Sequence, residues 1–145
     1  MILRQEYFEY SDCHYRMANP TLRYHQKGIH ASDSLTKLTY LASAVSHLLV
    51  STDHLLNWFL YPNVFKSRNA RYSSFESARK VKRGLSRKKQ ECVITHPFTI
   101  EIIRNRLWYL SSQKSIKDAV NDLTIKEVNK LFEEADYVRK ILETL

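Results

Sequence analysis

The clearest pattern in the chain is an apolar seam over residues 33–60. Its side chains recur at alternating steps of three and four residues, which places them on one face of an α-helix. The seam follows Leu38, Leu41, Val45, Leu48, Thr52, Leu55 and Phe59, and it is widened by Leu35, Leu49 and Leu56. Ser32 or Asp33 can cap the start of this helix, and Pro62 ends it. The pattern predicts a helix of about 28 residues, roughly 42 Å long, on which the rest of the chain packs.

A second apolar face lies in residues 96–112. Four of its residues recur at helical spacing: Ile100, Ile103, Leu107 and Leu110. Pro97 fits the first turn of such a helix, where its missing N–H costs nothing. The run Arg-Asn-Arg at 104–106 interrupts the apolar face in its middle. Strong donors at the centre of an apolar helix need partners or a function.

Two further segments complete the helical pattern. Thr124 to Glu127 is a capping box, in which the Thr hydroxyl and the Glu carboxylate satisfy opposite backbone N–H groups. It opens a helix over residues 124–145 with the apolar seam Val128, Leu131, Ala135, Val138, Leu142 and Leu145. An N-terminal helix over residues 3–17 ends before Pro20.

These segments predict an all-α protein, a helical bundle of four to five helices that forms a single domain over residues 1–145. The chain has only two glycines and three prolines. Sheet proteins need many tight turns, so this composition favours long helices with few connections.

Charge is concentrated in the connecting segment at 62–94. The formal net charge of the chain is +8, yet residues 66–90 hold ten basic residues and one acidic residue, so that stretch carries +9 and the remainder sums to −1. A basic cluster of this kind is typical of polyanion binders, although a solvated loop has the same composition. The residues predicted to bind nucleic acid are Arg79, Lys80, Lys82, Arg83, Arg87, Lys88 and Lys89.

Several kinds of chemistry find no support. The chain has no Gly-rich phosphate loop, no paired-Cys zinc pattern and no His-Glu-x-x-His pattern, so we expect neither a cofactor nor a metal. Tyr40, His47 and His54 recur every seven residues, and we interpret them as a boundary stripe beside the core. Cys13 and Cys92 suggest no disulfide framework, and no apolar run reaches the length of a membrane span. A reducing cytoplasm and no membrane partner are expected.

The order of parts resembles the HEPN superfamily. The resembling residues are Ile103-Arg104-Asn105-Arg106-Leu107-Trp108-Tyr109, then Leu123 to Val128 and the final apolar helix. The resemblance implies a small helical bundle, often a metal-independent ribonuclease of toxin–antitoxin, abortive-infection or CRISPR systems. In that family two copies usually meet to form one site, built from an Arg, commonly a following Asn, and a His five to seven positions after the Arg.

This chain departs from the motif at one position. Arg104 and Asn105 match, but Tyr109 stands where the His is expected, and no histidine follows His96. An imidazole titrates near neutrality, whereas a phenol titrates at about pH 10 and serves only to donate a hydrogen bond at pH 7. Either catalysis has been lost while binding is kept, or the Tyr silences a toxic nuclease. Arg104 has a structural alternative, which is an ion pair inside the bundle with Glu101, Glu133 or Asp136.

The candidate catalytic residues are therefore Arg104, Asn105 and Tyr109, with Trp108 beside them as a stacking surface. The resemblance predicts an RNA-binding protein of a defence or toxin–antitoxin system, acting as a homodimer and either a ribonuclease or a silenced one. The alternative is a non-catalytic helical interaction module. Such a module would be an immunity or antitoxin-like protein, or a subunit of a nucleoprotein complex, with a partner protein.

Overall fold

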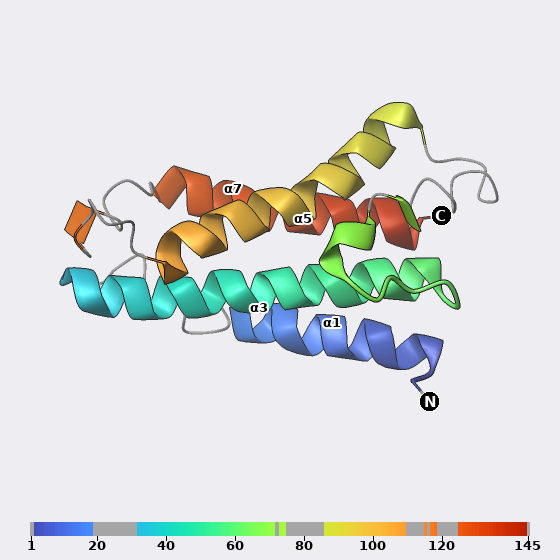
Figure 1. The fold of residues 1–145 in the computed structure, drawn as a ribbon, viewed down its shortest axis with the longest axis horizontal. Helices are drawn as coiled ribbons and strands as arrows, with labels where there is room; N and C mark the ends of the chain where they lie inside the picture. Colours follow the sequence, from blue (N-terminus) through green and yellow to red (C-terminus); the bar gives the residue numbers. More distant parts are fainter. Residues whose placement is uncertain are drawn as a thin grey trace.

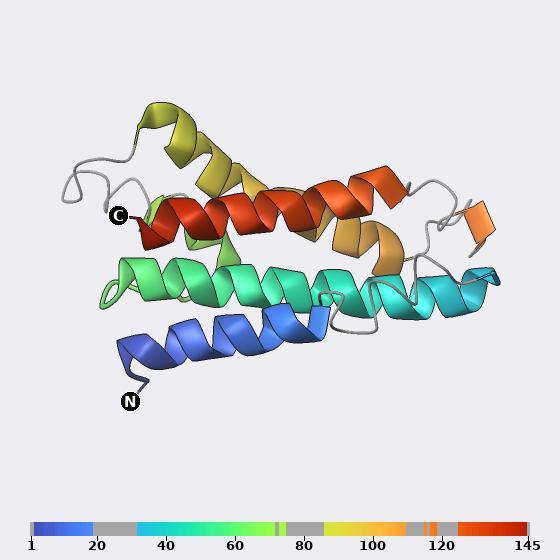
Figure 2. The same ribbon diagram turned by 180° about the vertical axis from the view of Figure 1, so that it is seen from behind.

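The protein is a bundle of α-helices (Figures 1 and 2). The computed structural model describes residues 2–18, 32–71, 73–74, 86–109, 115, 117–118 and 125–144. The helices, in chain order, are α1 (Arg4–Ala18), α3 (Ser34–Leu60), the short 3-10 helix η1 (Arg68–Ala70), α5 (Arg87–Trp108) and α7 (Ile125–Glu143). These described ranges contain helices and no strand, so the predicted all-α bundle is confirmed.

α3 is the spine of the bundle, as its apolar period predicts. Asp33 caps it, because its Oδ1 accepts a hydrogen bond of 2.9 Å from the backbone N–H of Thr36. The helix has 27 residues, which makes it about 40 Å long. One predicted seam residue, Leu35, is instead 62% exposed. It lies in the first turn of α3.

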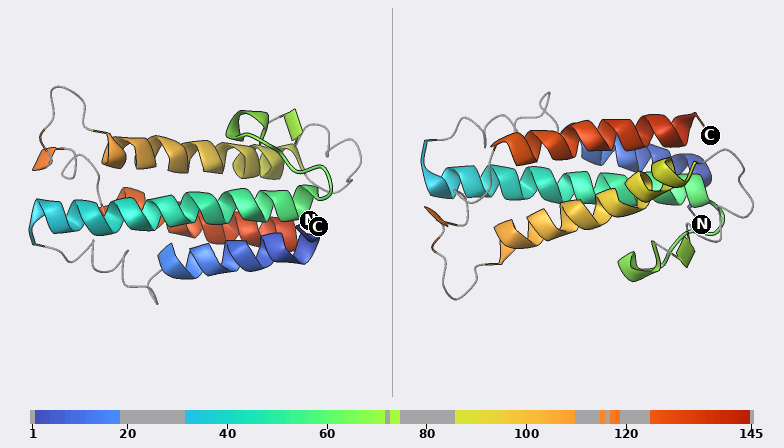
Figure 3. Two further views of the ribbon diagram at one scale, coloured as in Figure 1. Left: turned by 60° about the horizontal axis from the view of Figure 1, so that its bottom comes forward. Right: turned by 90° about the horizontal axis from the view of Figure 1, so that it is seen from above.

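The other helices surround the core with α3. α1 and α5 pack on opposite sides of α3, and α7 packs against α5 and α3. α7 also reaches α1, because the Tyr15 hydroxyl donates to Asp136 and Arg139 pairs with Asp12. Figure 3 shows this arrangement from two further sides. α1 approaches α3 closely at Ser11 and Ser51, where each buried hydroxyl donates to the other's backbone carbonyl at 2.7 Å.

The core runs along α3 as two apolar clusters. The first joins α3 to the C-terminal half of α5 and the start of α7 through buried residues that include Leu41, Leu48, Ile100, Ile103, Leu107 and Leu131. The second joins the other end of α3 to the start of α5 and the end of α7, with Leu56, Phe59, Phe65, Val93, Ile141 and Leu142. The C-terminal half of α5 is thus anchored on one face and carries its polar residues on the other.

The helix predicted to begin at residue 96 begins at Arg87 instead, so Pro97 lies inside α5 and not in its first turn. Ser86 caps the helix by accepting from the backbone N–H of Lys89 at 3.2 Å. An internal proline removes one backbone hydrogen bond and crowds the preceding turn. The added turns compensate by burying Val93 and Ile94, and the axis of α5 bends along its length (Figure 1).

Other predicted boundaries have mixed outcomes. α1 (Arg4–Ala18) and α7 (Ile125–Glu143) match the predicted helices closely. The Thr124 cap lies outside the described residues. α5 ends at Trp108, four residues before the predicted end. In the part of the chain that the structure describes, no helix is both long and apolar enough to cross a lipid bilayer.

Candidate nucleic-acid interface

Arg104 lies in the last turns of α5 and stacks on Trp108. Its guanidinium carbon is 4.8 Å from the centroid of the Trp108 ring, and Nη2 donates to Asn105 Oδ1 at 2.9 Å. The indole in turn rests on α3, where Nε1 donates to the carbonyl of Ala42 at 3.5 Å. Helical spacing of four residues produces the stacking, because residues i and i+4 lie on one face.

The alternative ion pair for Arg104 is not formed. Among the described residues, Arg104 bonds neither Glu133 nor Asp136, and Glu101 is held by two other arginines. The Nε atom of Arg104 is buried without a hydrogen-bond partner in this part of the chain, while the rest of the side chain is half-exposed. Within the described residues, the guanidinium of Arg104 therefore has no acidic partner.

Tyr109 is displaced from Arg104 because it is the residue at which α5 ends. Its backbone is extended, with φ −118° and ψ 115°, and its N–H closes the helix on the carbonyl of Asn105 at 3.0 Å. The side chain is 65% exposed. The structure thus brings the side chains of Arg104 and Asn105 into contact, whereas the Tyr109 side chain hydrogen-bonds neither of them.

The end of α5 also exposes apolar surface. Ile102 and Trp108 are 62% and 52% exposed, and Tyr109 is exposed to a similar extent. Together with Arg104 and Asn105 they form what we call the Arg–Trp end of α5. It offers a cation, an amide and two exposed aromatic rings. No histidine of the described residues belongs to it, because His96 lies two turns earlier and bonds α7.

Of the basic residues predicted to bind nucleic acid, three are described by the structure and four lie outside the described ranges. Arg87, Lys88 and Lys89 are exposed in the first turn of α5. They stand at the positive end of the helix dipole, where cations are unfavourable and anions are attracted. Arg79, Lys80, Lys82 and Arg83 lie outside the described residues. The neighbouring Gln90 is buried because it falls on the core side of α5.

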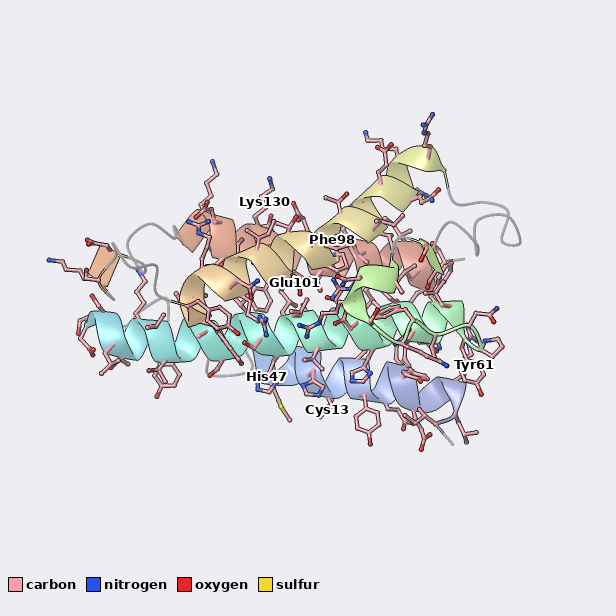
Figure 4. The ribbon with its side chains drawn as sticks, viewed as in Figure 1. Cys13, His47, Tyr61, Phe98, Glu101 and Lys130 are labelled. Atoms are coloured by element: carbon pink, nitrogen blue, oxygen red, sulfur yellow. The ribbon has the colours of Figure 1, made fainter. Side chains whose placement is uncertain are left out.

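Two arginines of the basic segment are already neutralised, which sequence reasoning missed. Arg71 is fully buried; its Nε donates to Asp53 Oδ1 at 2.8 Å and its Nη1 to Glu101 Oε2 at 3.2 Å. Arg68 also contacts both carboxylates. Burial raises the pKa of Asp53, although both arginines act to lower it. Glu101, the member of this network that α5 contributes, is labelled in Figure 4. It fastens η1 to α3 and α5 and leaves fewer cations for a polyanion.

The predicted boundary stripe on α3 becomes a histidine cluster. His14 of α1 lies across from it, with its Nδ1 3.0 Å from Nδ1 of His47 and its ring stacked 5.9 Å from that of His54. Burial lowers the pKa of all three imidazoles. No group of three or more His, Cys, Asp or Glu residues within the described ranges is placed to hold a metal ion.

A cleft of about 400 Å³ lies between α5 and α7, next to the basic first turn of α5. Its buried histidine, His96, places Nδ1 3.3 Å from Glu134 Oε2 of α7. Burial lowers the pKa of His96, while Glu134 acts to raise it. No local sequence pattern indicates this pair, because the two residues are 38 positions apart.

Comparison with protein-family models, with curated proteins and with solved structures found no match to this chain. The HEPN resemblance therefore remains a prediction that rests on the motif residues quoted above.

Proposed function

We propose that this protein is an RNA-binding, HEPN-like helical domain that acts in a defence or toxin–antitoxin setting. The observation that carries the proposal is Arg104, whose guanidinium lies over the exposed ring of Trp108 and has no acidic partner among the described residues. A guanidinium binds phosphate with several donors at once, and an exposed aromatic ring stacks on any base.

The two ends of α5 support the same reading. Arg87, Lys88 and Lys89 begin the helix, and the Arg–Trp end finishes it. Arg87 and Arg104 are 17 residues apart, or about 25 Å along the axis. A single strand of RNA is long enough to contact both. Because phosphate contacts release counterions, binding should weaken steeply as salt is added.

Catalysis is expected to be weak or absent. Metal-independent cleavage needs a base for the 2′-hydroxyl and an acid for the leaving oxygen, which imidazole supplies near neutral pH. The motif position holds Tyr109, which is the C-cap residue of α5 and is 65% exposed. Arg104 would bind the scissile phosphate without a neighbouring acid–base group.

The test is fluorescence anisotropy with a labelled single-stranded RNA. Arg104→Ala should weaken binding by about tenfold or more, since it removes a charge-assisted phosphate contact. Arg16→Ala is the matched control, because Arg16 is an exposed arginine on α1 whose acidic partner within the described residues is Asp12 at 2.9 Å. Equal affinity of the two variants would refute Arg104 as an RNA contact.

A second pair of variants tests the start of α5. Reversing Arg87 and Lys89 to Glu should weaken RNA binding. It should also reduce the slope of log affinity against log salt concentration by the amount expected for about two lost phosphate contacts. Reversing Lys126 and Lys140, two exposed cations of α7, changes the net charge equally. If both double variants lose the same affinity, net charge alone explains binding and the first turn of α5 is not the contact.

One observation favours the alternative, a protein-interaction module. Ile102, Trp108 and Tyr109 are large and exposed at one end of α5, and Trp, Tyr and Arg are the residue types that dominate protein interfaces. The predicted homodimer would bury them near Arg104. Sedimentation at tens of micromolar tests this dimer, which the HEPN resemblance predicts as well. A monomer at that concentration would contradict the predicted homodimer, and only RNA binding by the monomer would keep the RNA-binding part of the first proposal.

A further inference from the structure

The cleft between α5 and α7 has a defined chemical lining. One stripe of α5, with steps of three or four residues, forms one wall, and α7 forms the other. The polar residues at its walls are Lys88, Glu91, Thr95 and Thr99 from α5, and Lys130 and Glu134 from α7. Figure 4 shows Lys130 projecting from α7 on this side of the bundle. A volume of about 400 Å³ is within the range of small-ligand sites in proteins.

Glu134 is held in place from beneath the cleft. The His96 side chain is 1% exposed, and its Nδ1 lies 3.3 Å from Glu134 Oε2. A carboxylate only accepts, so Nδ1 carries the proton and donates. The Nε2 atom of the same ring is buried and has no partner among the described residues, so the ring's hydrogen bonding is directed entirely at Glu134. This contact fixes the carboxylate and leaves its second oxygen to the cleft.

Among the described residues, no group donates a hydrogen bond to the second oxygen, Oε1. Its nearest cation is Lys130 Nζ at 3.8 Å, which is beyond hydrogen-bond distance. Glu134 is one-third exposed, so a ligand can reach this oxygen. The cleft thus presents an oriented acceptor, with Lys88 and Lys130 at its walls.

This combination of charges selects among ligands. A simple anion would be repelled by the carboxylates of Glu91 and Glu134, and a simple cation would be repelled by the ammonium groups of Lys88 and Lys130. A nucleotide satisfies both, because its phosphate suits lysine and the donor groups of its base suit a carboxylate. Guanine fits best, since its N1–H and N2–H are adjacent parallel donors: Oε1 can accept one of them, and Oε2 has a second lone pair, besides the one that faces His96, to accept the other. None of the other three bases has two adjacent donors on that edge: adenine and cytosine each have one amino donor next to an acceptor, and uracil has one N–H between two carbonyl acceptors.

We propose that the cleft binds one guanine nucleotide of a single-stranded RNA, with Glu134 accepting from the base and Lys88 and Lys130 contacting flanking phosphates. The inference rests on the RNA binding proposed above and adds a base preference to it. Its position supports it, because Lys88 belongs both to the cleft and to the basic first turn of α5. An RNA strand leaving that turn enters the cleft directly.

The experiment compares three labelled octamers of uridine, in which one central position is uridine, guanosine or inosine. Inosine lacks the N2 amino group and removes one donor without any change to the protein. The guanosine octamer should bind about tenfold more tightly than the uridine octamer, in line with one bidentate base contact. The inosine octamer should lose most of that gain.

Protein variants localise the preference. Glu134→Gln should abolish the gain from guanosine, because an amide replaces one acceptor by a donor. Glu133→Gln, on the exposed side of α7 and not at the cleft, should retain it. Lys130→Ala should weaken all three octamers alike and keep their order, since it removes a phosphate contact. A circular dichroism melt establishes that each variant is folded.

The outcomes separate the two proposals. If all three octamers bind the wild-type protein equally, the guanine cleft is refuted and RNA binding stands. If guanosine is preferred and Glu134→Gln keeps the preference, the base is read elsewhere and the cleft is refuted. If no octamer binds at low salt, RNA binding itself fails and this inference fails with it.

Discussion

Replacing Arg71 by Met should destabilise the fold by about 3 kcal/mol. The sequence places Arg71 in the basic segment, where a surface position with little effect on stability would be expected. The side chain is 1% exposed and contacts Asp53 Oδ1 through Nη2 at 2.7 Å and Glu101 Oε2 through Nη1 at 3.2 Å. Removing one member of a buried ionic network costs about 3–5 kcal/mol, since the charges left behind lose their partner. The lower end applies because Arg68, at 3.1 Å from Asp53, still holds the two carboxylates.

The measurement is urea unfolding followed by far-UV circular dichroism, with the midpoint compared at constant m-value. For a chain of this size about 3 kcal/mol corresponds to roughly 10 °C in melting temperature. Arg16→Met is the control, because Arg16 is 74% exposed and pairs with Asp12 at the surface, so its loss costs at most about 0.5 kcal/mol.

Two results would refute this reasoning. The first is an Arg71→Met midpoint that coincides with the Arg16→Met midpoint. The second concerns the double variant Asp53→Asn with Arg71→Met, in which the buried carboxylate is neutralised together with its partner. Coupling between the two residues requires that the double variant be less destabilised than the sum of the single variants. Simple additivity would show that the ionic contact is not the source of the cost.

Two further predictions concern pH and catalysis. Burial lowers the pKa of His14, His47 and His54. As the pH falls through the ordinary histidine pKa of about 6.5, the unfolded chain therefore binds more protons than the folded chain. The stability that the fold has above that pH should then decline as the pH approaches the lowered pKa values of the folded state. The melting temperature should therefore drop between pH 7.5 and 5.5, and His14→Gln should reduce that drop; a drop of unchanged size would exclude the cluster as its cause. Tyr109→His should create or raise RNA cleavage by about 10²–10⁴-fold if the position is a HEPN site. EDTA should not inhibit this cleavage, and the double variant with Arg104→Ala should lose it. A folded Tyr109→His protein without nuclease activity would favour the interaction module.

The sequence by itself determined the helical elements. The three- and four-residue steps of α3 identify its buried face, and Asp33 caps it where a cap residue was expected. These features are local, because a helix needs only a periodic apolar face and a side chain that satisfies its first N–H groups. The spacing of Arg104 and Trp108 likewise predicted that the two would share a face, and the stacking at 4.8 Å confirms it.

Only the tertiary structure decided how α5 begins. A proline is commonest in the first turn of a helix, so residue 97 was a reasonable start from local rules. The helix instead starts at Arg87, since Val93 and Ile94 are buried in the core cluster beside α3 and α7. Burial of such side chains contributes about 1.5–3 kcal/mol each, which offsets the roughly 3 kcal/mol that an internal proline costs.

The tertiary structure also decided which polar residues are used within the protein. Arg71 and Asp53 are 18 positions apart, and His96 and Glu134 are 38 apart. A charge count assigns Arg71 to a basic surface, yet packing of η1 between α3 and α5 buries it. His14 likewise meets His47 only because α1 lies against α3. Periodicity reports which face of a helix is apolar, whereas the partner of a polar side chain depends on which helix packs beside it.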